Sequence, residues 1–239
     1  MPQLLIQIQK QPDDTTCGPT CLHAVYQYFD DDVSLESLID EVLTIDSGGT
    51  LAVHLACHAL RRGYRATLYT YNLQLFDPSW FEPGVDVAAK LLAQMAEKPD
   101  EKLNSATAGY LEYLRLGGVI RFEDLSEKVI QRHLSQGVPI LTGLSATYLY
   151  GSKREFGSSN LVDDIRGLPV GHFVVLCGHR AAEREVQIAD PLHPNPLSQQ
   201  HVYSLSVDRV IGAILLGIVT YDANLLVLEP AARRESNRP

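Results

Sequence analysis

A β-branched and apolar run from Val170 to Cys177 most limits what this chain can fold into. The residues from Arg180 to Glu185 supply a polar turn, and a second run, from Glu185 to Ala189, follows it. This pattern predicts an antiparallel hairpin. His172 lies near the entry of the hairpin and Asp190 at its exit. Because the two strands of a hairpin run side by side, the prediction places these two side chains beside each other.

Helical spacing dominates the first half of the chain. Apolar residues recur at helical intervals from Cys17 to Phe29, and Ser34 and Thr50 are expected N-caps of two more helices, so we predict the first sixty residues to be helical. The remaining predicted helices cover 86–97, 106–116, 124–135 and 206–215, and the remaining predicted strands cover 64–71, 138–144 and 224–228. We therefore predict one α+β domain over 1–230, with a helical N-terminal part, a C-terminal antiparallel sheet and a disordered tail over 231–239.

The charge balance excludes several classes of partner. The 239 residues include 20 Lys and Arg against 29 Asp and Glu, a net charge of -9, which repels nucleic acid and anionic membranes. This excess of acidic residues would favour a cationic peptide as a partner, although an excess of this size is ordinary in soluble proteins. Val210 to Val219 is the longest apolar run near the end, and a membrane span needs roughly twenty residues. With no secretory leader before Gln11, we predict a cytoplasmic protein without membrane insertion.

Cys17 stands at the start of a predicted helix, directly before Gly18 and Pro19. A cysteine in this position faces the positive end of the helix dipole and unpaired backbone N–H groups, which favour the nucleophilic thiolate. Gly18 lets backbone approach the thiol, and proline is favoured in the first turn of a helix. Most cysteines are small buried residues, but the order Cys-Gly-Pro at a helix start indicates an accessible thiol. All four cysteines are expected to be free, since their spacing fits no disulfide framework.

Three further side chains complete a constellation around Cys17. Gln11 lies six residues earlier, and the turn between them can aim its amide N–H₂ at the place where the Cys17 N–H points, which would form an oxyanion hole. His172, held on a strand, is the expected general base, whereas His179 at the far end of that strand points away from the site. Asp190 can accept a hydrogen bond from the imidazole and hold its tautomer.

The stretch from Gln11 to Leu22, the strand from Gly171 to Val175 and the turn from Ile188 to Pro191 resemble the bacteriocin-processing, or double-glycine, cysteine peptidases. This family is papain-like. The resemblance implies a papain-like fold and a cysteine peptidase that acts on a peptide or protein substrate, without a cofactor or metal.

By the same resemblance, Gln11 is the oxyanion-hole residue, Cys17 the nucleophile, His172 the general base and acid, and Asp190 the residue that orients the imidazole. The chain lacks the transporter segments to which many family members are fused, so we expect a stand-alone branch. The helices predicted between Leu73 and Gly118 come in addition to the compact peptidase domain.

Other interpretations use the same residues. A Cys-His-Asp triad can transfer the acyl group of its thioester intermediate to an amine instead of water. The protein would then be an acyltransferase or a transglutaminase-like enzyme. A non-catalytic module could keep the groove only to bind a peptide, although the presence of all four residues argues against it. His54 and His58 lack the intervening glutamate of a zinc peptidase, so we predict a partly exposed helix face and no metal site. These motifs specify neither the substrate nor the oligomeric state.

Overall fold

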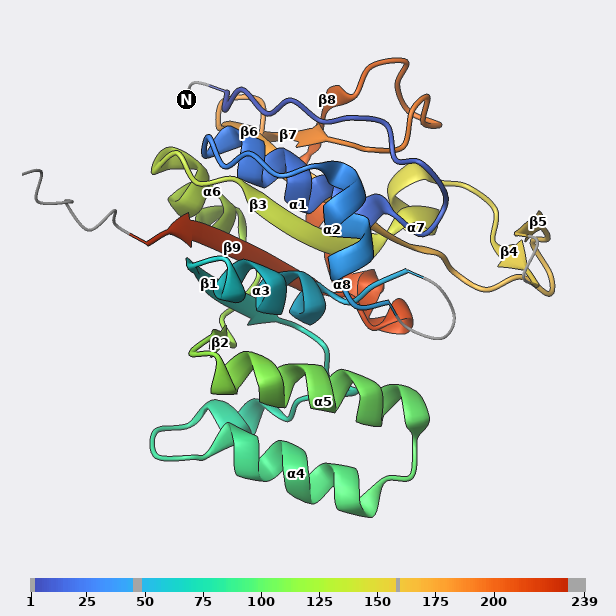
Figure 1. Cartoon of the computed structure of the whole chain (residues 1–239). Coiled ribbons are helices and arrows are strands. Elements are labelled where there is room, and N and C mark those ends of the chain that lie inside the picture. The colour runs from blue at the N-terminus through green and yellow to red at the C-terminus, as the bar shows by residue number, and fades with distance from the viewer. Residues whose placement is uncertain (1–2, 45–48, 158–159, 232–239) are drawn as a thin grey trace, which may run out of the picture.

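The structure is a computed structural model, and it describes residues 3–44, 49–157 and 160–231. Its centre is a seven-stranded sheet in the order β2-β1-β9-β3-β6-β7-β8. The β1–β2 pair is parallel, and every other neighbouring pair in this sheet is antiparallel. Figure 1 shows α1, α2 and α3 in front of the sheet and α8 behind it. In the described part of the chain, no helix is long and apolar enough to cross a membrane.

The elements alternate along the chain in the manner of an α+β fold. The helices are α1 (Cys17–Tyr28), α2 (Leu35–Glu41), α3 (Ala52–Arg61), α4 (Val87–Glu97), α5 (Glu101–Arg115), α6 (Glu127–Ser135), α7 (Ala146–Tyr150) and α8 (Val207–Leu216), with short 3₁₀ helices η1 (Pro78–Phe81) and η2 (Gly217–Thr220). The strands are β1 (Tyr64–Thr70), β2 (Val119–Arg121), β3 (Ile140–Ser145), β4 (Glu155–Phe156), β5 (Leu161–Val162), β6 (Gly171–Arg180), β7 (Glu185–Ala189), β8 (Val202–Ser206) and β9 (Asn224–Pro230).

The predicted hairpin is the pair β6–β7, and it packs directly against the first helix. Ala189 at the end of β7 lies opposite Val175 of β6. The buried thiol of Cys21 on α1 donates a hydrogen bond to the carbonyl of Phe173 on β6, at 3.2 Å. The helix that begins at Cys17 is therefore fixed against the strand that carries His172.

The start of the chain differs from the prediction that the first sixty residues are helical. The segment over 3–10 is extended, with Leu4, Ile6 and Ile8 buried and the residues between them exposed. The Leu4 N–H donates to the carbonyl of Cys177, so this segment follows β6. Its alternating pattern has the period of a strand, and the contact with the sheet prevails over helical propensity.

Two other details correct or extend the sequence prediction. Ser34 caps α2 as predicted, since its hydroxyl accepts from the Ser37 N–H, but Thr50 does not cap α3. The Thr50 hydroxyl donates instead to the carbonyl of Leu43, and Leu51 is the N-cap residue. The elements β8, α7 and the small β4–β5 hairpin were not predicted. Most of the predicted tail, 232–239, lies outside the described residues.

The helices α4 and α5 form an addition beside the main sheet. Figure 1 shows the pair as a layer below α3, joined to the sheet through β2. The Tyr113 hydroxyl on α5 lies within hydrogen-bond distance of the carbonyls of Ala66 on β1 and Val119 on β2, at 2.7 and 2.9 Å. This buried side chain therefore connects the added pair to the edge of the sheet.

Candidate active site

Cys17 is the first residue of α1, and the side chain of the residue before it does not cap the helix. The N-cap residue is Thr16, whose hydroxyl accepts from the Asp13 N–H at 3.2 Å and contacts the Asp13 carbonyl at 3.1 Å. The first N–H groups of the helix are therefore left for a thiolate or for a bound anion. The Cys17 side chain is partly exposed.

His172 and Asp190 are joined by a direct hydrogen bond. The His172 Nε2 lies 2.9 Å from the Asp190 Oδ1, and both side chains are buried. Since Nε2 is engaged, Nδ1 is the ring nitrogen left for the thiol of Cys17, which is close enough to raise the pKa of His172. The structure thus brings together the three residues that the sequence placed in one site.

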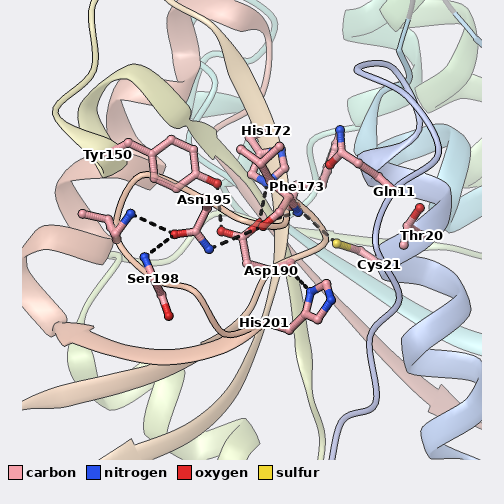
Figure 2. A network of polar contacts seen from close by, with 12 residues as sticks. Gln11, Thr20, Cys21, Tyr150, His172, Phe173, Asp190, Asn195, Ser198 and His201 are labelled. Atoms are coloured by element: carbon pink, nitrogen blue, oxygen red, sulfur yellow. Dashed lines mark hydrogen bonds and ion pairs between the residues drawn. The ribbon is translucent and has the colours of Figure 1, made fainter.

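Two tyrosines that the sequence did not predict also hold the Asp190 carboxylate, and Figure 2 shows one of them, Tyr150. Tyr150, at the end of α7, donates to Oδ2 at 2.8 Å, and Tyr203 on β8 donates to the same oxygen at 2.7 Å. The Leu192 N–H donates to Oδ1 at 2.9 Å. With His172, four donors surround this buried carboxylate. The alternation of apolar and serine residues in 202–206 is a strand signal that could have indicated Tyr203.

The backbone of Asp190 is fixed by the loop that follows it. The Asp190 N–H donates to the carbonyl of His201 at 2.9 Å, and the His201 Nδ1 donates to the Asp190 carbonyl at 2.8 Å. Within the loop, the Asn195 side-chain oxygen accepts from the Ser198 N–H at 2.8 Å. Figure 2 shows this network beside Asp190. Hydrogen bonds therefore hold Asp190 both at its carboxylate oxygens and at its backbone.

The electrostatics of the pair favour an ionised carboxylate and a protonated imidazole. Burial alone would raise the pKa of Asp190, but the hydrogen bonds from His172, Tyr203 and Tyr150 outweigh it and lower that pKa. Burial lowers the pKa of His172, yet Asp190 and Cys17 raise it well above its ordinary value. Burial and the Asp190 charge raise the pKa of both tyrosines, so their hydroxyls stay protonated and remain donors.

Gln11 lies in the loop before Cys17, where its side chain is buried. The Nε2 donates to the carbonyl of Asp13 at 2.8 Å, which uses one of its two protons. The Oε1 is buried and has no hydrogen-bond partner among the residues that the structure describes. The backbone N–H of Gln11 donates to the carbonyl of Pro191 at 3.0 Å, which ties this loop to the turn after Asp190. The structure therefore brings Gln11 to the same site.

Comparison of the sequence with models of known protein families identifies the family of this chain. Residues 3–208 match the model of the peptidase C39-like family. The chain belongs to the peptidase C39-like family. The predicted resemblance is thereby confirmed, as are the α+β, papain-like fold and the assignment to the cysteine peptidases. A search of curated protein sequences finds no match.

Solved structures resemble the peptidase over nearly its whole length. A structure described as a C39-like peptidase from Bacillus anthracis is 14% identical, with a TM-score of 0.51, over 96% of this chain and 98% of that one. The peptidase domain of Streptococcus ComA, a bifunctional ABC transporter, is 15% identical, with a TM-score of 0.44, over 95% and 99%. A double glycine motif protease from an AMS/PCAT transporter, solved with its leader peptide, is 13% identical, with a TM-score of 0.45, over 96% and 94%. The first of these supports the fold alone.

The other three cysteines of the peptidase lie in environments that disfavour the thiolate. Cys21, Cys57 and Cys177 are buried. Burial raises the pKa of all three thiols, to about 11 for Cys57 and about 12 for Cys177. Cys17 is therefore the one cysteine of the four that is not buried.

The rival histidines have structural partners elsewhere. As predicted, His179 lies away from the site, where its Nε2 bonds Glu127 at 2.9 Å. The prediction of a partly exposed face for His54 and His58 is wrong, because α3 packs against both β1 and α5 and buries both rings. His58 bonds the Tyr26 hydroxyl at 2.9 Å and the carboxylate of Glu41 at 3.0 Å, and His54 bonds a backbone carbonyl.

Proposed function

We propose that this cysteine peptidase hydrolyses peptide bonds with Cys17 as nucleophile, His172 as general base and acid, and Asp190 as the residue that positions the imidazole. One observation carries the proposal. The partly exposed Cys17 stands at the start of α1 beside a buried imidazole whose other nitrogen bonds Asp190 at 2.9 Å. Membership in the peptidase C39-like family supports the same chemistry.

In the first half of the reaction, the His172 Nδ1 takes the proton of the Cys17 thiol, and the thiolate attacks the carbonyl carbon of the substrate. The charge that develops on the carbonyl oxygen is met by the Cys17 backbone N–H and by the free N–H proton of the Gln11 amide. The tetrahedral intermediate then collapses, the C–N bond breaks, and the imidazolium gives its proton to the leaving amine. A thioester on Cys17 remains.

In the second half, His172 takes a proton from water, and the hydroxide attacks the thioester carbonyl. Collapse of this intermediate releases the carboxylic acid and returns the proton to the Cys17 sulfur. Asp190 stays ionised throughout, because its lowered pKa and four donors favour the carboxylate. An ionised Asp190 keeps the imidazole in the tautomer that presents Nδ1 to the thiol.

Turnover of a peptide pool by variants tests the proposal. Cys17→Ala and His172→Ala should each reduce cleavage by at least about 10⁴-fold, since each removes a group that forms or breaks bonds. The matched control is Cys57→Ala, a buried cysteine outside the site, which should keep its turnover. Full activity in Cys17→Ala or His172→Ala would reject the assignment. Products formed with and without an added amine distinguish hydrolysis from amide exchange.

A further inference from the structure

A second buried carboxylate, Asp222, lies at the edge of the same site and takes no part in the mechanism above. Its side chain is placed in the turn between η2 and β9, and the residue is only 6% exposed. Both neighbours adopt left-handed backbone conformations, with φ of 68° at Tyr221 and 61° at Ala223. Residues with a β-carbon rarely adopt this conformation, so the chain accepts strain on both sides of this one carboxylate.

Two glycines leave the space that the carboxylate fills. A β-carbon on Gly143 of β3 would lie 2.6 Å from the Asp222 Oδ1, and one on Gly171 of β6 would lie 2.5 Å from the Oδ2. Both distances are too short for any side chain to share the space. Since Gly171 directly precedes His172, the carboxylate rests against the backbone next to the proposed base.

Asp222 has too few partners for a buried charge. Among the described residues, the structure gives its carboxylate one hydrogen-bond donor, the Thr220 hydroxyl at 2.7 Å. The single proton of that hydroxyl is also within reach of the Gly217 carbonyl, at 3.0 Å. Burial raises the pKa of Asp222 to about 7. A buried carboxylate without a counterion is costly, and such groups are typical of functional sites.

A substrate at Cys17 can come near this carboxylate. The Asp222 carboxylate lies against the backbone at Gly171, and it is close enough to His172 for the charge of that imidazole to lower its pKa. We propose that Asp222 determines specificity by binding a cationic group of the peptide substrate, namely a lysine or arginine side chain or an amino terminus. This inference rests on the proposed function, because it takes the substrate to be a peptide held at Cys17. The net charge of -9 is favourable to the approach of such a peptide.

Two cationic groups of the chain, Lys102 of the added helix α5 and the imidazole of His172, lower the pKa of the Asp222 carboxyl. The exposed ammonium of Lys102 lies 4.6 Å from the centre of the Tyr221 ring and is held there by a cation–π contact. No hydrogen bond joins these two described side chains, so Lys102 leaves the carboxylate free for a cation of the substrate.

The test compares peptides with arginine or its neutral isostere citrulline at each position in turn. Binding to the full-length Cys17→Ala variant is measured by fluorescence polarisation, which requires no turnover. At one position or more, arginine should bind at least about ten-fold more tightly than citrulline. Asp222→Asn, which keeps the shape and the bond from Thr220, should abolish the preference and leave citrulline binding within about two-fold.

The matched control is Asp124→Asn, which removes the same charge at an exposed residue and should keep the preference. The inference is overturned if no position prefers arginine, or if the preference persists in Asp222→Asn. That result leaves the proposed function intact, provided that the wild-type protein cleaves peptides. Conversely, a preference for arginine in a protein that cleaves no peptide would overturn the proposed function alone.

Discussion

The turn after β7 and the turn before β9 each bury an aspartate near His172, and the two differ in what surrounds them. Asp190 receives four hydrogen bonds, and its pKa is lowered despite complete burial. Asp222 receives one from the described part of the chain, and its pKa is raised to about 7. The number of donors, rather than burial, therefore decides whether each carboxylate is held in its ionised form.

This difference in hydrogen-bond donors is consistent with different roles for the two carboxylates. A carboxylate that positions an imidazole has to remain charged and fixed through the whole reaction, and four donors provide this for Asp190. A carboxylate that binds a cation has to keep part of its hydrogen-bonding capacity free until the ligand arrives, as Asp222 does. Substitutions of either aspartate, or of the tyrosines that bond Asp190, therefore separate the two roles.

The largest effect is expected when the donors of Asp190 or its charge are removed. Asp190→Asn should reduce kcat/KM by roughly 10²–10⁴-fold, because the imidazole loses its orientation and charge partner. Tyr150→Phe and Tyr203→Phe should each cost about ten-fold, since a hydrogen bond to a charged group contributes roughly 1.5–3 kcal/mol. Steady-state kinetics with a neutral peptide measures the series.

In the same assay, Asp222→Asn should change kcat/KM for the neutral peptide by less than about three-fold.

The pH dependence of kcat/KM in Tyr150→Phe and Tyr203→Phe is measured in the same way. Loss of a donor raises the pKa of Asp190, so activity should disappear at a higher pH on the acid side than in the wild-type protein. Equal losses in Asp190→Asn and Asp222→Asn would contradict the division of roles between the two carboxylates.

A smaller effect is expected on stability. Because the pKa of Asp222 in the folded protein is raised to about 7, the protonated form stabilises the fold at low pH, and this contribution is lost as the pH rises through about 7. Asp222→Asn should therefore be more stable than the wild type at about pH 8, by on the order of 2–4 kcal/mol. The gain should shrink toward pH 4. Thermal unfolding at several pH values measures it, and a gain independent of pH would exclude ionisation of Asp222 as the cause.

The parts of the site that were predicted from sequence depend on short-range signals. Cys17 was found because a Gly-Pro pair marks a helix start, and His172 and Asp190 because a hairpin has a recognisable alternation and turn. These elements form where the sequence expects them, with β6 and β7 as the hairpin. The structure adds the hydrogen bond that joins His172 to Asp190.

The remainder depends on contacts between distant segments. Tyr150 and Tyr203 reach Asp190 from 40 and 13 residues away, and no local pattern shows that they converge. Asp222 is held by left-handed conformations at Tyr221 and Ala223, which sequence rules assign to glycine or asparagine rather than to these residues. Tertiary packing decides both arrangements, so only the structure could show them.

The central claim, that His172 activates Cys17, is tested most directly by a short iodoacetamide pulse on the folded protein, followed by mass spectrometry of the peptides containing each cysteine. Cys17 should react at least about ten-fold faster than Cys21, Cys57 and Cys177, and His172→Ala should slow Cys17 by a similar factor without changing the other three. If Cys17 reacts no faster than the buried cysteines, or keeps its full rate in His172→Ala, the thiol is not activated and the account of the site is wrong.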